Sequence, residues 1–130
     1  MIFVDADAFI AIYVESDFHH SKAIEINKLK PKEEVVTSSE VIFEVTTKLS
    51  YFTTHKLATY FLSEILKSSV TIEYITPARL QQTMSLFSKQ TSKRVSLTDC
   101  TNMVICKELG IKNIFSFDQH YTKNGFKLLK

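Results

Sequence analysis

The sequence predicts an α/β protein, a three-layer α/β/α sandwich around a mostly parallel sheet of four to five strands. Short apolar runs alternate along the chain with longer segments of helical periodicity, and this alternation favours parallel strands joined by right-handed helical crossovers. The length of 130 residues fits a single domain, 1–130, because domains most often contain about 100–150 residues. A hydrophobic content of 45% suits a buried core and argues against disorder.

The first half of the chain predicts two strands and four helices. The expected elements are a strand at 2–5, a helix that begins beside Asp5 and runs toward Val14, a helix at 17–29, a strand at 34–37 and helices at 39–51 and 54–67. The helix at 54–67 is expected because its apolar residues recur at helical spacing on one face. These residues are Leu57, Phe61, Leu62, Ile65 and Leu66.

The second half predicts a strand at 70–75, a helix that starts at Thr76-Pro77, a helix at 98–109, a strand at 113–117 and a short edge strand at 126–129. Thr is a favourable helix cap and Pro a favourable first helical residue, and this helix should bury Leu80, Met84 and Phe87. The polar, basic segment 89–95 predicts a surface loop. Gly110 should end the helix at 98–109.

Composition excludes several classes of protein. No stretch approaches the roughly 20 apolar residues of a membrane span, and the N-terminus has no signal-peptide pattern, so we expect a cytoplasmic protein without a membrane partner. Cys100 and Cys106 lie six apart on one predicted helix and project from different faces, which favours buried thiols over a disulfide or a metal clip. The four histidines show no metal-ligand spacing, and structural or solvated roles are expected for them. They are His19, His20, His55 and His120.

Four acidic residues stand where one predicted element gives way to the next, and they are the candidate site: Asp5, Glu44, Asp99 and Asp118. Asp5 and Asp118 follow buried apolar runs, at the carboxyl ends of strands, where open parallel sheets bind their ligands. Each also has an ordinary explanation, since Asp5 and Asp99 could cap helices and Asp118 could begin a turn. Only the four together favour a divalent metal site.

The neighbouring acidic residues are interpreted differently. Asp7 either caps a helix or lies at the rim of the site. Glu40 fits a capping box in Thr37-Ser38-Ser39-Glu40, with Thr37 as the cap, which explains it without a function. Glu44 lies one turn further along an otherwise apolar helix, where a carboxylate must find water, a cation or a partner.

The charge distribution suits a nuclease. The net charge is +2, from 16 basic and 14 acidic side chains. If the four candidate carboxylates are set aside, 14 − 4 = 10 acidic side chains remain against the 16 basic ones. Cations that hold phosphates around an acidic metal site are typical of metal-dependent nucleases, although basic surfaces also serve solubility. Lys89, Lys93 and Arg94 precede Asp99 and could contact the phosphate backbone of a nucleic acid. Exposed aromatic residues would be needed to contact bases, and the candidates are Tyr13, Phe18 and Tyr121.

The chain resembles the PIN-domain ribonucleases, and most closely the toxin half of the VapBC toxin–antitoxin pairs of bacteria and archaea. The resemblance rests on four short segments that occur in the family's order and approximate spacing along the whole chain. They are Ile2-Phe3-Val4-Asp5-Ala6-Asp7-Ala8-Phe9-Ile10, the segment from Thr37 to Val45, Leu97-Thr98-Asp99-Cys100, and the segment from Ile114 to Tyr121. The set of segments, rather than any one of them, carries the likeness.

This resemblance implies a parallel sheet, Mg²⁺ or Mn²⁺ as cofactor, RNA as substrate, a small antitoxin protein as partner and a homodimer. Asp5, Glu44, Asp99 and Asp118 match the family's acidic quartet, although Glu40 is a rival for Glu44. Ser116 matches a small hydroxyl residue that often precedes the last Asp by two. The expected metal ligands are Asp5, Asp99 and Asp118, and Glu44 would orient the attacking water or complete a second metal position.

Other functions stay open at this point. A PIN-type nuclease could serve RNA maturation instead of toxicity, or the fold could bind partners without catalysis. The pair Asp5-Ala6-Asp7 after an apolar strand also resembles the start of a haloacid-dehalogenase-type phosphatase. That family's expected Thr or Val after the pair and its later paired Asp motif are absent from the sequence, so this alternative is remote.

Overall fold

The computed structural model describes residues 1–29 and 32–130. Its strands form one sheet in the order β3-β2-β1-β4-β5, and all four neighbouring pairs are parallel. The strands are β1 (Ile2–Val4), β2 (Val35–Ser38), β3 (Thr71–Glu73), β4 (Asn113–Phe115) and β5 (Lys127–Leu128). The predicted parallel sheet is confirmed, including the short edge strand near the end of the chain, although β3 and β4 are shorter than expected.

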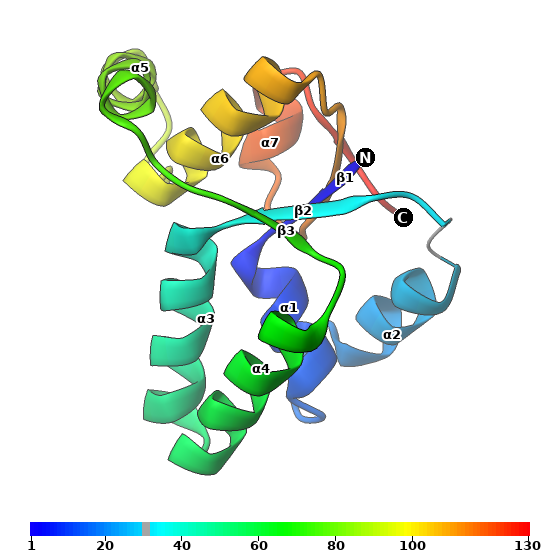
Figure 1. Ribbon diagram of the computed structural model, residues 1–130. Helices are drawn as coiled ribbons and strands as arrows, with labels where there is room; N and C mark the ends of the chain where they lie inside the picture. The colour runs from blue at the N-terminus through cyan, green and yellow to red at the C-terminus, as the bar shows by residue number, and fades with distance from the viewer. Residues whose placement is uncertain (30–31) are drawn as a thin grey trace.

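Helices cover both faces of the sheet, which confirms the three-layer sandwich (Figure 1). One layer contains α1 (Ala6–Tyr13), α2 (His20–Leu29), α3 (Ser39–Phe52) and α4 (His55–Lys67). The other contains α5 (Pro77–Ser88), α6 (Leu97–Leu109) and α7 (His120–Lys123). The sequence did not predict α7, because four residues are too few to show a helical period. Within the described ranges, none of these helices is long and apolar enough to cross a bilayer.

The strand order creates a switch point beside β1. All three residues of β1 are buried, as expected for a central parallel strand covered on both faces. The chain leaves β1 toward β2 and β3 on one side, and later forms β4 and β5 on the other. Ligands of open parallel sheets bind outside the carboxyl ends of the strands at such a point. Asp5 and Ser116, which directly follow β1 and β4, therefore border the expected binding position.

Local capping rules explain most helix boundaries, with one correction. The side chain of Thr76 accepts a hydrogen bond from Arg79 N (3.2 Å), and Gly110 ends α6 with a φ of 70°, as predicted. The capping box assigned to Thr37 and Glu40 is wrong. The cap of α3 is Ser38, whose hydroxyl accepts from the backbone of the first turn, because the Thr37 hydroxyl instead donates to the Val4 carbonyl (2.8 Å) across the sheet.

The buried face of α5 also differs from the prediction. Leu80, Met84 and Phe87 are exposed, and the side chains that α5 buries are Arg79 and Thr83. Arg79 faces inward because its guanidinium forms ion pairs with Glu108 of α6 and with Glu73 at the end of β3. The apolar stripe of α5 therefore faces outward, and Leu66 of α4, predicted on a buried face, is exposed as well. Cys100 and Cys106 are buried free thiols, as predicted.

Replacement of Arg79 by Leu is expected to destabilise the fold by about 2–3 kcal/mol, because it leaves partly buried polar groups without a partner. Arg79 donates to both carboxylate oxygens of Glu108 (3.0 Å each), to Glu73 (2.9 Å) and to the Tyr74 carbonyl (2.7 Å). Urea denaturation measures the change. The neighbouring exposed substitution Leu80→Ala should shift stability by less than about 0.5 kcal/mol, and an equal effect of both substitutions would contradict this account.

Candidate active site

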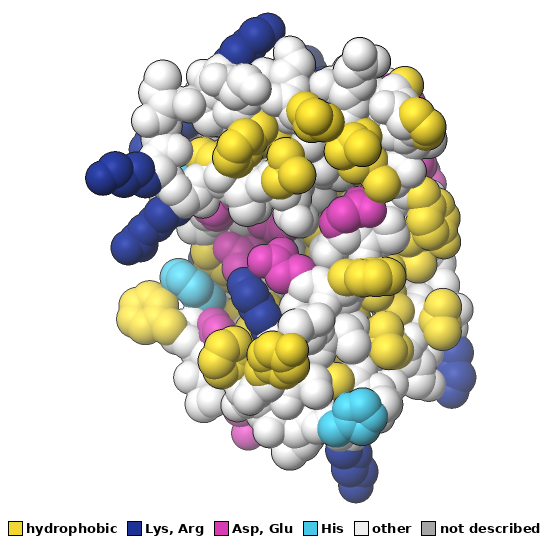
Figure 2. Space-filling model, turned by 90° about the vertical axis from the view of Figure 1, so that its left-hand side faces the viewer, with side chains coloured by type: hydrophobic (Ala, Val, Ile, Leu, Met, Phe, Trp, Pro, Cys, Tyr) yellow, Lys and Arg dark blue, Asp and Glu magenta, His cyan; other side chains and the backbone are white. Residues whose placement is uncertain are grey.

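Carboxylates from distant parts of the chain meet at the switch point. Asp5 follows β1, Asp118 follows β4, and Asp99 lies in the first turn of α6. Oxygens of Asp99 and Asp118 and a ring nitrogen of His120 all lie within 4.8 Å of one another. Figure 2 shows acidic side chains gathered near the middle of one face, with Lys and Arg side chains projecting beside them. The structure thus brings Asp99 and Asp118 close together, and Asp5 lies beside them through its contact with Ser116.

The Ser116 hydroxyl lies at the centre of the aspartates. Its Oγ is 3.1 Å from an oxygen of Asp5 and 3.1 Å from an oxygen of Asp7, and it accepts a hydrogen bond from the Asp118 backbone N (3.1 Å). One hydroxyl hydrogen cannot serve two carboxylates at once, so the arrangement favours either a shared proton or a cation nearby. Asp7, predicted as a cap or a rim residue, is held inside the cluster by a further bond from Phe117 N (2.9 Å).

Asn102 orients Asp5 and was missed by the sequence prediction. Its side-chain Nδ2 donates to Asp5 Oδ1 (3.1 Å) and to the Tyr121 hydroxyl (3.0 Å), while its Oδ1 accepts from the Ser38 hydroxyl (2.9 Å). Ser38 also caps α3, so one network joins the start of that helix to the carboxylate after β1. The available signal was spacing, because Asn102 lies three residues after Asp99 and therefore on the same face of α6.

Asp99 has both a structural and an electrostatic role. It forms a capping box with Ser96, whose hydroxyl accepts from Asp99 N and whose backbone N donates to Asp99 Oδ2, both at 3.0 Å. The capping alternative is therefore real, but it occupies only one carboxylate oxygen. The other oxygen is available to the cluster. Capping here fixes the orientation of the carboxylate instead of replacing its function.

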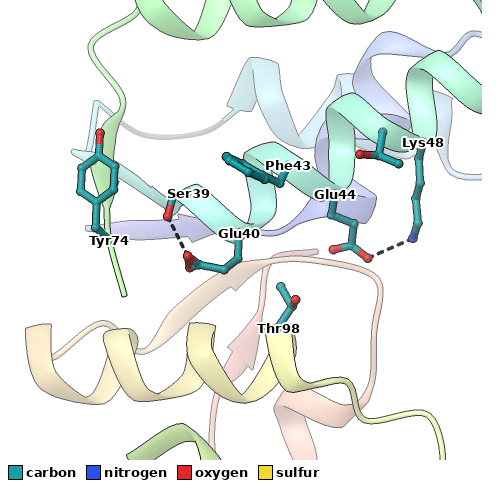
Figure 3. A pocket seen from close by; sticks show the side chains of 8 residues that line it. Ser39, Glu40, Phe43, Glu44, Lys48, Tyr74 and Thr98 are labelled. Atoms are coloured by element: carbon teal, nitrogen blue, oxygen red, sulfur yellow. Dashed lines mark hydrogen bonds and ion pairs between the residues drawn. The ribbon is translucent and has the colours of Figure 1, made fainter. Parts of the chain in front are cut away.

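Glu44 projects from α3 toward Thr98 at the start of α6, one residue before Asp99 (Figure 3). Its carboxylate pairs with Lys48 Nζ at 3.1 Å, and its charge contributes to raising the pKa of Asp99 after burial and the charge of Asp118. Together with Glu40, Phe43 and other residues it lines a cavity of about 610 Å³. The cation partner expected for Glu44 is thus Lys48 in this structure. Glu40 lines the same cavity and accepts from the Ser39 hydroxyl (2.7 Å).

Burial makes the clustered carboxyl groups weak acids. Loss of solvation, with the charges of Asp7 and Asp99 adding to it, raises the pKa of Asp5 to about 8. Burial likewise raises the pKa of Asp7, where the Asp118 charge adds to it, and the pKa of Asp99. Carboxylates this close cannot all ionise without a compensating cation. The site should therefore hold either protons or a metal.

The donor set fits a hard divalent cation. The groups that converge are mainly carboxylate oxygens, the ligands that Mg²⁺ and Mn²⁺ prefer. In addition, Asp7 Oδ1 is buried and has no hydrogen-bond partner among the residues that the structure describes, which is costly unless a cation or water compensates. Among the described residues, Asp99 and Asp118 have carboxylate oxygens close enough to share such an ion, with His120 beside them. The predicted ligand Asp5, like Asp7, lies next to this group and is connected to it through Ser116.

His120 is a further site residue that sequence reasoning missed. Its Nδ1 lies 2.7 Å from Asp118 Oδ1, and its Nε2 lies 3.2 Å from the Ser92 hydroxyl in the loop before α6. A single histidine without ligand spacing gives little signal in a sequence. Here it can orient Asp118, as residues around metal ligands commonly do.

The residues predicted to contact RNA differ in how exposed their side chains are. Lys93 and Arg94 are exposed on the loop before α6, in keeping with a role toward phosphates. Tyr121 is fully buried and bonded to Asn102, so its assignment to base contacts is wrong. Tyr13 packs edge-on against a core aromatic ring and is half-buried. Phe18, by contrast, is 94% exposed.

Comparison with known proteins identifies the family of the chain. The family model of the PIN domain matches residues 2–127. The 23S rRNA-specific endonuclease VapC20 of Mycobacterium tuberculosis is 28% identical over 126 residues, which cover 97% of this chain and 95% of that protein, and the sequences from two strains match equally well. The crystal structure of M. tuberculosis VapC20, a sarcin–ricin loop cleaving toxin, superposes with a TM-score of 0.91 at 26% identity, covering 97% of this chain and 96% of the other.

A more distant structure extends the likeness of fold alone. FitAcB from Neisseria gonorrhoeae has a TM-score of 0.69 at 13% identity, covering 100% of this chain and 97% of the other. The resemblance to PIN-domain proteins and their VapC-type members, inferred from four short segments, is confirmed. Because the family model extends over almost the whole sequence, the chain belongs to the PIN domain family.

Proposed function

We propose that this protein is a metal-dependent endoribonuclease and the toxin of a toxin–antitoxin pair. The observation that carries the proposal is the set of buried carboxylates at the switch point, joined through Ser116 and kept from full ionisation by burial. Support also comes from its relatives, which are named as a 23S rRNA-specific endonuclease. Membership of the PIN family replaces the remote phosphatase alternative.

The chain's own residues divide the work of hydrolysis. Asp5, Asp99 and Asp118 would hold Mg²⁺ or Mn²⁺, with Asp7 available as a further oxygen donor. When bound, such an ion lowers the pKa of water and offsets negative charge on the phosphate oxygens. Glu44 would orient the attacking water, and its ion pair with Lys48 holds its carboxylate at the margin of the site. Attack by water leaves a 5′-phosphate and a 3′-hydroxyl.

Residues around the carboxylates keep them in place before substrate arrives. Asn102 fixes Asp5, the capping box fixes Asp99, and His120 contacts Asp118. Preorganised groups of this kind need little rearrangement during the reaction. Lys93 and Arg94 would attract the RNA backbone beside the site, and this attraction should weaken as salt concentration rises.

The proposal includes protein partners in the cytoplasm. A small antitoxin would cover apolar surface and present a cation to the acidic site, and a second copy of the chain would form a homodimer. Exposed hydrophobic side chains on α3, α4 and α5 support such contacts. They include Phe43, Tyr60, Leu66, Leu80, Met84 and Phe87.

Addition of Mg²⁺ or Mn²⁺ is expected both to start RNA cleavage and to stabilise the folded protein. A stem–loop RNA with the sarcin–ricin sequence, labelled at its 5′ end, reports cleavage and the product ends. An ion at 100 times its dissociation constant should raise the free energy of unfolding by about 2.7 kcal/mol, which a thermal melt with and without EDTA would detect. Cleavage that persists in EDTA would contradict the proposal.

A growth assay separates the toxin from an RNA-maturation nuclease or a binding protein without catalysis. Induced expression of the wild type should arrest growth, and Asp99→Asn should not. Growth unaffected by an enzyme that cuts RNA in vitro would favour a role in maturation. Metal stabilisation without cleavage of any RNA would favour the non-catalytic alternative.

A further inference from the structure

Three aromatic rings connect the active-site edge of the sheet to the surface. Phe117 lies between Ser116 and Asp118, and its backbone N donates to Asp7 (2.9 Å). The His19 ring stacks on Phe117 with ring centroids 4.1 Å apart and planes 3° apart. The Phe18 ring then meets His19 edge-on, with a centroid distance of 4.9 Å and an interplanar angle of 89°. Phe18 thus contacts His19, and His19 contacts Phe117, whose two neighbours in the chain belong to the carboxylate cluster.

The exposed Phe18 ring lies in an ordered turn, because hydrogen bonds hold the residues on both sides of it. Asp17 Oδ1 accepts from His19 N (2.8 Å), the Asp17 carbonyl accepts from His20 N (3.0 Å), and the His20 ring contacts the Ala11 carbonyl (2.7 Å). A lone exposed hydrophobic residue is ordinary. One that is 94% exposed, braced by a fixed turn and stacked rings beside a catalytic site, is placed to meet a ligand.

A cavity of about 430 Å³ adjoins the stack. Its lining combines two lysines and several aliphatic residues with polar and aromatic ones, and it includes Lys22, Lys130, Ser116, Gln119, His19 and Phe117. This volume lies within the range of roughly 300–1,000 Å³ typical of small-molecule sites. Ser116, which also contacts Asp5 and Asp7, is part of the lining, so the cavity borders the carboxylate cluster. Lys22 pairs with Glu25 at 3.2 Å on the surface, and such exposed pairs are weak enough to exchange for a phosphate.

We propose that Phe18 is a stacking platform for an unpaired RNA base close to the cleaved bond, with Lys22 and Gln119 contacting the adjoining phosphate and sugar. This inference rests on the proposed nuclease function and names how that site holds its substrate. Proteins commonly hold splayed-out RNA bases by stacking them on aromatic rings next to a cationic groove. Stacking tolerates any base, so the platform selects an unpaired position and not a sequence.

The test measures binding of the fluorescein-labelled sarcin–ricin stem–loop by anisotropy in EDTA, where cleavage is blocked. Stacking of one base contributes about 1–3 kcal/mol by alanine substitution, so Phe18→Ala should weaken binding about 5- to 150-fold. Phe18→Trp should restore it. The matched control is Phe52→Ala, which removes an equally exposed ring at the far end of α3 (80% exposed) and should leave binding unchanged.

Three further measurements test the contact. Placing 2-aminopurine at each loop position in turn should reveal one position whose fluorescence the wild type quenches and Phe18→Ala does not. Lys22→Gln should weaken binding and reduce the dependence of log Kd on log salt by about one phosphate contact. Cleavage by Phe18→Ala under Mn²⁺ should fall in kcat/KM at low RNA concentration and recover at saturating RNA.

The outcomes separate this inference from the proposed function. If Phe18→Ala binds and cuts like the wild type, the platform is overturned and the nuclease stands. If the substitution instead changes the oligomeric state in light scattering and leaves RNA binding intact, Phe18 serves a protein contact and the platform is again overturned. If the wild type binds RNA through Phe18 but cuts nothing with Mg²⁺ or Mn²⁺, the platform stands and the nuclease function fails.

Discussion

Asp99→Asn is expected to lower the rate of metal-dependent RNA cleavage by about 10³-fold or more while leaving the fold intact. The substituted side chain can still accept the hydrogen bond from Ser96 N (3.0 Å) and so preserve the start of α6. What it loses is the second carboxylate oxygen and the negative charge, and a neutral amide is a poor ligand for Mg²⁺. Losses of this size follow removal of one preorganised group from a catalytic site, and single-turnover rates on the stem–loop RNA would measure them.

The two glutamates of α3 provide a matched comparison. Glu44→Gln should reduce cleavage strongly, because Glu44 borders the cluster and acts on the Asp99 carboxyl through its charge. Glu40→Gln, one turn away in the same cavity, should keep most of the activity. The reverse result would move the fourth acidic position of the site to Glu40. Asp99→Asn retaining more than about a tenth of the wild-type rate would contradict the assignment of the whole cluster.

The candidate site residues that the sequence indicated are those whose positions depend on the ends of strands and helices. Asp5 and Asp118 each follow a short apolar strand, and the carboxyl ends of parallel strands share one edge of a sheet. The fold class alone was therefore enough to predict that these two residues lie at the same edge of the sheet. Asp99 was selected because it belonged to the set of four acidic residues, while helix capping was its rival explanation, and the structure shows that it does cap α6. Predictions of this kind combine a local pattern with one rule of topology.

Residues whose roles arise only from contacts between elements were not predictable. Asn102 acts by bridging Ser38 and Asp5, and His120 acts by meeting Asp118 and Ser92. The sequence shows only that Asn102 shares a helix face with Asp99, and the contact partners of Asn102 and His120 leave no pattern in it. The same limit explains the error on α5, because an amphipathic stripe predicts burial unless a buried ion pair such as that of Arg79 holds the opposite face inward. Thr37 was assigned as a cap by pattern, although its hydroxyl bonds across the sheet.

The metal-free protein is expected to lose stability as pH rises from about 5 to about 8.5. Burial raises the pKa of Asp5 from 3.8 to about 8, so between these values the folded state binds a proton that the unfolded state has released. Stability falls with pH wherever the folded state binds more protons. The raised pKa values of Asp7 and Asp99 act in the same direction. A shift of this size corresponds to a loss on the order of several kcal/mol.

Groups with lowered pKa values do not cancel this trend in that window. The pKa of Glu108 is lowered by its hydrogen bonds from Arg79, so its contribution is lost only as the pH falls through the lowered value. Urea denaturation in EDTA at pH 5.5, 7 and 8.5 measures the slope. Saturating Mg²⁺ or Mn²⁺ should flatten it, because the ion binds the deprotonated carboxylates and replaces the protons. If the stability of the metal-free protein does not depend on pH, the raised pKa values of Asp5, Asp7 and Asp99 are contradicted.

Asp5→Asn should therefore be inactive and, at pH 8 in EDTA, more stable than the wild type by on the order of a few kcal/mol. The amide keeps an acceptor toward Asn102 and can donate to Ser116, while the buried charge and its repulsion disappear. Glu64→Gln, on the exposed surface of α4, should change neither property. A variant that loses activity by misfolding would be less stable than the wild type. A variant that is more stable but does not cleave RNA would show that the Asp5 carboxylate destabilises the fold and is needed for the reaction. A less stable Asp5→Asn would mean that Asp5 is held mainly by its hydrogen bonds.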